Sequence, residues 1–275
     1  MKTIDIPLED TFADVISKAQ RGLGISDSEL AQKARLDAHT LRRLRAGEFD
    51  ELALFRVAPV LALGARALSD LAQDQYRPEV HEIDGLALFN TRFHDMRVNA
   101  FLVWDPKSRE ALAFDTGADA SEMLARAEEE GLTIKLILLT HAHPDHIADL
   151  ARLVNATPAP VYISGRESAP GAEAISEGKE FELGRLHIKT LLTWGHSRGG
   201  VTYFVTGLSR PLAIVGDSIF AGSMGGGNVS YKDALRNNLE KILTLPDETI
   251  ICPGHGPLTT VGQEKEHNPF FAGLI

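Results

Sequence analysis

The sequence predicts an α/β protein preceded by a small all-α segment. Residues 1–77 carry short helical patterns with few strand signals, whereas residues 78–275 mix apolar runs of strand length with helical patterns. The sequence pattern changes from helical to mixed at residues 73–79, where Arg77-Pro78 marks the expected domain boundary. We therefore expect two domains, at residues 1–77 and 78–275, which a chain of 275 residues is long enough to form.

The N-terminal segment is expected to form a bundle of five short helices. Ser26, with Glu29 three residues later, forms a capping-box pattern that begins the second helix. The expected helices cover residues 11–22, 27–34, 37–45, 52–63 and 65–73. Because a short turn joins the second helix to the third, the pair describes a helix-turn-helix unit.

The larger segment is expected to contain strands interspersed with helices. The strands are expected at residues 83–91, 98–104, 110–114, 134–139, 161–163, 180–183, 186–191, 201–205, 212–215 and 249–252. The helices are expected at residues 121–130, 147–154 and 233–243. Residues 92–97 are predicted to form a loop, and the glycine-rich residues 220–228 are predicted to form a mobile lid.

The highest density of possible metal-ligating side chains lies directly after the apolar run 134–139. His141-Ala-His143-Pro-Asp145-His146 places three imidazoles and a carboxylate within six residues, and the whole chain has only ten histidines. Ligand and catalytic residues concentrate in loops that a rigid scaffold holds. Imidazole suits Zn, Fe, Mn and Co, and a carboxylate adds charge that helps to hold a second cation. A chance cluster in a turn is the poorer interpretation.

The pattern H-x-H-x-D-H resembles the signature of the metallo-β-lactamase superfamily. The other elements of that signature follow in order, with Gly195-His196-Ser197, Gly216-Asp217-Ser218 and Pro253-Gly-His255-Gly downstream and Asp115-Thr-Gly upstream. Five elements in the right order are far more specific than one short motif. The resemblance implies an αββα sandwich with metals at one edge between its two sheets.

The resemblance also implies the roles of the individual residues. His141, His143 and His196 would bind the first of two divalent metal ions, most simply Zn, with Fe or Mn as alternatives. Asp145, His146 and His255 would bind the second, and Asp217 would bridge the two, so that Asp145 and Asp217 have catalytic roles. Asp115 would orient a ligand histidine by accepting its distal N–H; the alternative is an ordinary turn residue.

Two further residues are candidates for contact with a small-molecule substrate. Arg198 follows the His196 motif, and its guanidinium could pair with a carboxylate or phosphate; an exposed loop arginine is the alternative. His94 lies in the predicted loop 92–97, which often overhangs the site in this superfamily. The remaining histidines lie outside the motifs and are interpreted as surface or core residues.

The C-terminal run from Thr260 to Phe270 resembles the T-x-G-x-E-x-x-x-N-P-[FY] ending of compact glyoxalase II-like hydrolases. This resemblance implies a thioesterase of the hydroxyacylglutathione hydrolase type, acting through a metal-bound hydroxide. Classical glyoxalase II continues into a helical glutathione-binding domain, which we do not expect here. A lactonase and a mononuclear-iron persulfide dioxygenase are the alternative enzymes.

The N-terminal segment resembles the Cro/C1-type repressor family over residues 10–75. The resemblance makes residues 37–45 the groove-facing helix, with Arg42, Arg43 and Arg45, and Arg35 nearby, as candidate DNA contacts. A DNA-binding regulator that senses a metabolite is therefore an alternative of another class, and repressor-type bundles commonly dimerise. However, residues 1–75 carry ten Lys/Arg and twelve Asp/Glu, a net charge of −2. A bundle that packs on the catalytic domain is at least as consistent with that charge.

Composition sets the remaining expectations. The net charge of −10 disfavours broad binding to nucleic acid or anionic membrane. One cysteine, Cys252, permits no disulfide within the chain, and no apolar run approaches the length of a membrane span. No signal-peptide pattern is evident at the N-terminus. We expect a cytoplasmic enzyme.

Overall fold

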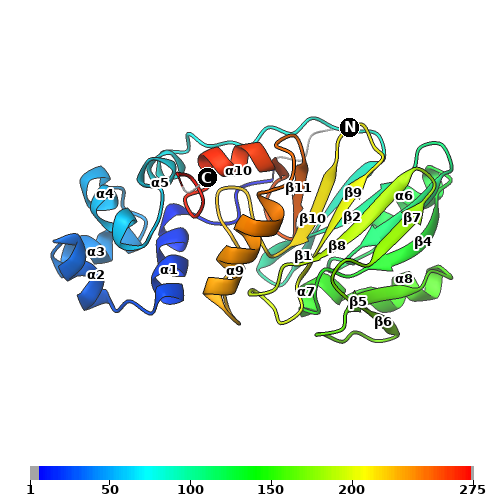
Figure 1. Ribbon diagram of the computed structural model, residues 1–275, viewed down its shortest axis with the longest axis horizontal. Helices are drawn as coiled ribbons and strands as arrows, with labels where there is room; N and C mark the ends of the chain where they lie inside the picture. The colour runs from blue at the N-terminus through cyan, green and yellow to red at the C-terminus, as the bar shows by residue number, and fades with distance from the viewer. Residues whose placement is uncertain (1–5, 274–275) are drawn as a thin grey trace.

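The computed structural model describes residues 6–273. Figure 1 shows a helical part at one end of an elongated molecule and two twisted sheets at the other end. Each sheet has six strands, and helices cover the outer face of each one. The larger part of the molecule therefore has the αββα layering that the sequence predicts.

The first sheet has the strand order β1-β2-β3-β4-β5-β6. β1 to β3 pair antiparallel, and β3 to β6 pair parallel. The strands are β1 (Leu86–Phe93), β2 (Met96–Trp104), β3 (Glu110–Phe114), β4 (Thr133–Leu138), β5 (Val161–Ser164) and β6 (Ala172–Ile175).

The second sheet has the order β12-β11-β10-β9-β8-β7, in which β10 and β11 run parallel and the other described neighbours run antiparallel. Its strands are β7 (Glu180–Leu183), β8 (Leu186–Leu192), β9 (Val201–Thr206), β10 (Leu212–Gly216), β11 (Ile250–Pro253) and β12 (Thr259–Thr260).

Three apolar cores hold these layers together. Phe114, Leu138 and Tyr203 belong to the core between the sheets, and Met123 belongs to the core beneath the helices of the first sheet. The helices of the larger part are α6 (Ser121–Glu129), α7 (Pro144–Ile147), α8 (Leu150–Ala156), α9 (Tyr231–Asn237), the π-helix η1 (Asn238–Ile242) and α10 (Val261–His267). Burial of these apolar faces supplies the main favourable term in folding.

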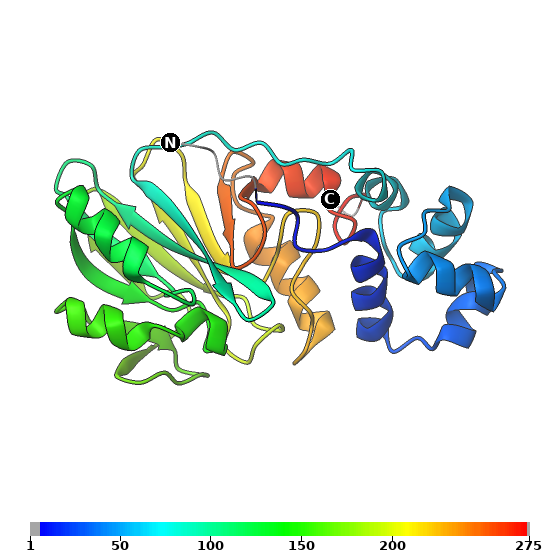
Figure 2. The ribbon, with the colours of Figure 1, turned by 180° about the vertical axis from the view of Figure 1, so that it is seen from behind.

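The N-terminal helices are α1 (Phe12–Leu23), α2 (Asp27–Ala34), α3 (Ala38–Arg45), α4 (Glu51–Val60) and α5 (Ala65–Ala72). Side-chain caps fix the start of the first three, at Thr11, Ser26 and Asp37. They share one continuous core with the outer face of the second sheet, in which Ile16 lies in the same cluster as Ile219 and Phe270. Figure 2 shows α1 standing next to α9 and the C-terminal segment.

Several sequence predictions are wrong in detail. Residues 92–97 do not form a long loop, because β1 and β2 continue to a tight hairpin turn at His94-Asp95. The expected helix 147–154 is two helices, α7 and α8, separated at Ala148-Asp149. β6, β12 and α10 were not predicted, because they are short or lack a strong periodic pattern.

The prediction of a mobile lid at residues 220–228 is also wrong. Residues 220–225 are buried, and a β-bridge joins Phe220 to Ser223.

Among the described residues, no helix has the length and apolar character needed to cross a membrane.

Candidate metal centre

Loops at one edge of the sandwich carry the candidate ligands. Asp115 follows β3, and residues 140–146 follow the parallel neighbour β4. On the second sheet, Asp217 follows β10 and His255 follows β11, which also run parallel. Parallel neighbours end at the same edge of a sheet, so residues distant in sequence meet there.

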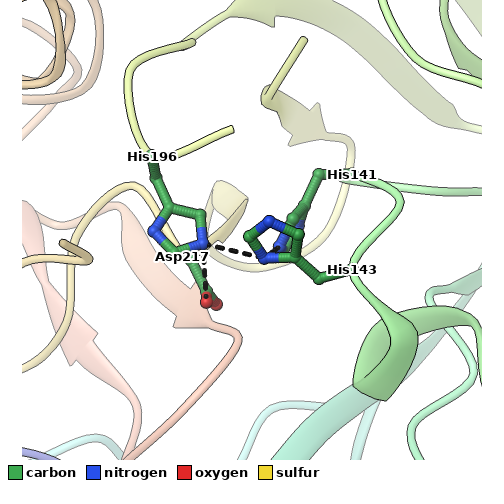
Figure 3. Close-up of side chains that lie close together, drawn as sticks. All are labelled: His141, His143, His196 and Asp217. Atoms are coloured by element: carbon green, nitrogen blue, oxygen red, sulfur yellow. Dashed lines mark hydrogen bonds and ion pairs between the residues drawn. The ribbon is translucent and has the colours of Figure 1, made fainter. Parts of the chain in front are cut away.

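His141, His143, His196 and Asp217 form the first cluster, which Figure 3 shows as sticks. His143 Nδ1 lies 3.0 Å from His141 Nε2 and 3.0 Å from His196 Nε2. Asp217 Oδ2 lies 3.3 Å from His196 Nε2. The three ring nitrogens thus converge on one point beside a carboxylate oxygen.

Asp145, His146 and His255 form the second cluster. Asp145 Oδ2 lies 3.3 Å from His255 Nε2 and 3.6 Å from His146 Nε2. Asp217 reaches this cluster as well, with Oδ1 at 3.3 Å from His146 Nε2 and Oδ2 at 3.5 Å from His255 Nε2. Asp217 is therefore placed between the two clusters.

The outer nitrogens of three histidines are each held by an oxygen acceptor. His146 Nδ1 donates to Asp115 Oδ2 at 2.8 Å, His196 Nδ1 to the Gly226 carbonyl at 3.0 Å, and His255 Nδ1 to the Arg97 carbonyl at 2.6 Å. Such bonds fix the tautomer that leaves the opposite nitrogen free as a lone-pair donor.

Asp115 has several partners besides His146. The Thr140 amide donates to its Oδ1 and the Thr140 hydroxyl to its Oδ2, both at 2.7 Å. Asp115 is buried and adopts a φ of 56°, a left-handed conformation that is uncommon for a residue other than glycine.

The inner atoms of the two clusters fit metal ions. His146 Nε2 and Asp217 Oδ1 are buried and have no hydrogen-bond partner. Buried polar atoms without partners are costly, and a cation between this imidazole nitrogen and this carboxylate oxygen would satisfy both. Nitrogen and carboxylate donors without thiolate suit Zn and the neighbouring divalent ions. The residues therefore fit two divalent cations.

Charge differs between the clusters in the metal-free protein. Burial lowers the pKa of His141 and of His196, so these imidazoles are neutral and ready to coordinate. Burial opposes the charged form of His146 and His255 as well, but Asp217 and the other carboxylates outweigh it. They raise these pKa values to about 10 and about 11. The second cluster therefore holds protons that a metal ion must displace.

The remaining candidates, for contact with substrate and with DNA, are exposed side chains. Arg198 and His94 are exposed, and His94 occupies the turn of the β1–β2 hairpin, packed against the Phe93 ring. Arg43 pairs with Glu48 and Arg45 with Asp27, both at 2.6 Å.

Arg42 and Arg35 are exposed on the same helical part. The Arg35 carbonyl accepts a bond from Arg56 at the turn between α2 and α3. Two of the four candidate DNA contacts, Arg43 and Arg45, are therefore already paired with carboxylates, which leaves less free positive charge for phosphates.

Glu167 is a residue that sequence reasoning missed. Its carboxylate accepts the Ala142 amide at 2.5 Å and the Gly199 amide at 2.8 Å, so it joins the loop of His141 and His143 to the loop of His196. It belongs to no short motif, and its distance of 25 residues from Ala142 gives no sequence signal.

A two-sheet sandwich with two clusters of His and Asp side chains at one edge defines a metal-binding type of protein. The chain belongs to the metallo-beta-lactamase superfamily, whose pattern matches residues 95–255.

Three similar proteins illustrate the relationship. The "Probable metallo-hydrolase YqgX" of Bacillus subtilis is 36% identical over 200 residues, which are 63% of this chain and 92% of the relative. The "Hydroxyacylglutathione hydrolase GloC" of Haemophilus influenzae is 29% identical over 197 residues, 62% of this chain and 92% of the relative. The crystal structure of TTHA1623 "in a di-iron-bound form" superposes with a TM-score of 0.54 and 30% identity, over 66% of this chain and 99% of that one.

Proposed function

We propose that this protein is a binuclear metallo-hydrolase that cleaves a thioester, with a hydroxyacylglutathione as the first substrate to test. The observation that carries the proposal is the position of Asp217, whose two oxygens reach histidines of both clusters. The likeness to GloC supports the thioester as substrate class, and the likeness to the di-iron protein supports a two-metal centre.

Two sets of side chains would each hold one divalent cation. His141, His143 and His196 would hold one divalent cation, and Asp145, His146 and His255 the other, with Asp217 shared between them. When bound, two such cations supply an activated water at neutral pH and polarise the carbonyl that it attacks. Zn is the first choice for this donor set, with Fe or Mn as alternatives.

The surrounding residues would keep these ligands in place during the reaction. The acceptors at Asp115, Gly226 and Arg97 hold the outer nitrogens, so each imidazole would keep its inner nitrogen turned toward the cation without rotation of the ring. Geometry held in advance reduces the reorganisation that the reaction requires. Asp145 would accept the proton that the attacking water loses and pass it to the departing thiolate, while Asp217 would hold both cations in place.

Hydrolysis assays on metal-loaded protein test the proposal. Purified protein is reconstituted with Zn, Fe or Mn and offered a hydroxyacylglutathione, a lactone and a persulfide, the last with oxygen uptake as the readout. We expect thioester hydrolysis that His143→Ala abolishes and that the exposed-site control His187→Ala leaves unchanged. Lactone hydrolysis alone, or oxygen uptake with iron and no hydrolysis, would replace the proposal by one of the alternative enzymes.

A further inference from the structure

The segment from Phe220 to Gly226 forms one wall of the metal centre. The Gly226 carbonyl accepts the bond from His196 Nδ1, and the Phe220 ring lies 5.7 Å from the His255 ring, edge to face. A methyl group at Gly225 would lie 1.8 Å from the Asp217 carbonyl oxygen. Three of the seven ligands therefore depend on the position of this wall segment, residues 220–226.

One set of buried polar contacts holds the wall segment from the C-terminal side. Glu264, which has no exposed surface, accepts the Gly222 amide at 3.0 Å and the Tyr76 hydroxyl at 2.5 Å. Asn268 Nδ2 donates to the Ser223 carbonyl at 2.7 Å and to Glu264 at 2.7 Å. Glu264 and Asn268 belong to the T-x-G-x-E-x-x-x-N-P-F run of residues 260–270, to which the proposed chemistry gives no other role.

A second set of contacts comes from the N-terminal helical part. Lys18, on α1, donates to the Met224 carbonyl at 2.9 Å, forms an ion pair with Asp10 and lies 5.1 Å from the centre of the Phe220 ring. Asp10 also accepts the Ser223 hydroxyl at 2.6 Å. Both charged side chains are largely buried, with 15% and 9% of their surface exposed.

The chain before α1 lies against the loop of His255. A methyl group at Gly256 would lie 3.2 Å from the Glu9 amide nitrogen, so the two backbones are in contact. Figure 2 shows this segment passing beside the loop that follows β11. The N-terminal helical part is therefore joined to the metal centre at two places.

We propose that Lys18 and Asp10 are positioning residues of the metal centre, acting on His196 through the wall segment. The inference rests on the metal centre of the proposed function and gives the N-terminal helices a role in it. Removal of the Lys18 ammonium frees the Met224 carbonyl and leaves the Asp10 carboxylate buried without its cation, which is unfavourable. The wall segment then shifts, and the Gly226 carbonyl no longer aligns with His196 Nδ1.

The test is a titration of the metal-free 275-residue chain with Co²⁺, monitored by the visible absorption of the bound ion. Lys18→Met is compared with Lys33→Met, which removes an exposed lysine of the same helical part. We expect Lys18→Met to bind Co²⁺ roughly tenfold more weakly with shifted absorption bands. The kcat of Lys18→Met for thioester hydrolysis should fall with little change in KM. Lys33→Met should match the wild type in Co²⁺ affinity, absorption bands and kcat.

The outcomes separate the inference from its alternatives. A lower Tm with unchanged absorption bands and affinity for Co²⁺ would show that Lys18 stabilises the fold only, and would overturn the inference. If Lys18→Met does not fold, Ser223→Ala removes a single contact to Asp10 and is titrated in the same way, with unchanged binding again overturning it. A wild type that binds no Co²⁺ would instead contradict the metal centre itself.

Discussion

Replacing Asp115 by Asn tests how the metal centre is held. The Asp115 carboxylate accepts three bonds, from the Thr140 amide, the Thr140 hydroxyl and His146 Nδ1. An amide of the same shape keeps one oxygen and places an NH₂ group among these donors. A donor then faces a donor, and His146 is free to move its proton to the nitrogen that should bind metal.

The expected loss of metal affinity can be estimated from the hydrogen bond that the substitution removes. A hydrogen bond to a charged partner contributes about 1.5–3 kcal/mol, and removing the partner of a ligand histidine costs about 10–100-fold in metal affinity. The two estimates agree, because about 1.4 kcal/mol corresponds to a tenfold change in affinity. We expect Asp115→Asn to weaken the binding of the second cation by this factor while the first is retained.

Competition with a chelator of known affinity measures the effect, with the extent of hydrolysis followed on the same samples. Asp119→Asn is the matched control, because Asp119 lies four residues further along and is 57% exposed. Equal metal affinity for Asp115→Asn and Asp119→Asn would refute the reasoning and would reduce Asp115 to an ordinary turn residue.

Three further predictions follow from the geometry of the site. Glu167→Ala frees the two loops that its carboxylate joins, so kcat should fall by about tenfold or more with the fold retained by circular dichroism; an unchanged kcat would contradict this. Gly225→Ala should lower the stability by about 1–3 kcal/mol through overpacking against Asp217, measured as a loss of Tm. Gly165→Ala, whose methyl group would meet its nearest neighbour at 3.6 Å, should be tolerated. The affinity for the second cation should rise with pH between neutrality and about pH 10, because the two histidines of that cluster carry raised pKa values and must lose protons on binding; calorimetry that detects no proton release at pH 7 would exclude this.

The candidate ligands could be named from sequence because their motifs resemble the metallo-β-lactamase signature, and the structure brings them together in two clusters. The motifs of His141, Asp217 and His255 each follow an apolar strand, which fixes where the loop emerges, and the resemblance implied that these loops meet at one edge. The order of the motifs then indicated which residues meet. The distances that place Asp217 between the clusters required the structure.

The supporting contacts could not be predicted in the same way. Glu167 and the Gly226 carbonyl act across long sequence separations, and one of them is a backbone oxygen that no residue type reveals. The glycine-rich stretch was misjudged as a lid, because small residues permit flexibility but also permit close packing. Here Gly225 is a glycine because the chain approaches the Asp217 backbone too closely for a side chain.

The role of the N-terminal helices shows a second limit. The pattern of residues 25–47 describes two helices and a turn, and the structure has α2 and α3 there. The pattern does not tell which surface these helices use. The apolar core that they share with the second sheet, and the contact of Lys18 with Met224, become visible only in three dimensions.

The central claim, a two-metal centre bridged by Asp217, is tested most directly by the number of bound metal ions. Elemental analysis of the reconstituted wild type and of Asp217→Asn, after removal of free metal, gives that number. The account predicts about two divalent ions per chain in the wild type and at most about one in the variant, with hydrolysis lost. One ion per chain in both proteins, or two ions in Asp217→Asn with activity retained, would contradict it.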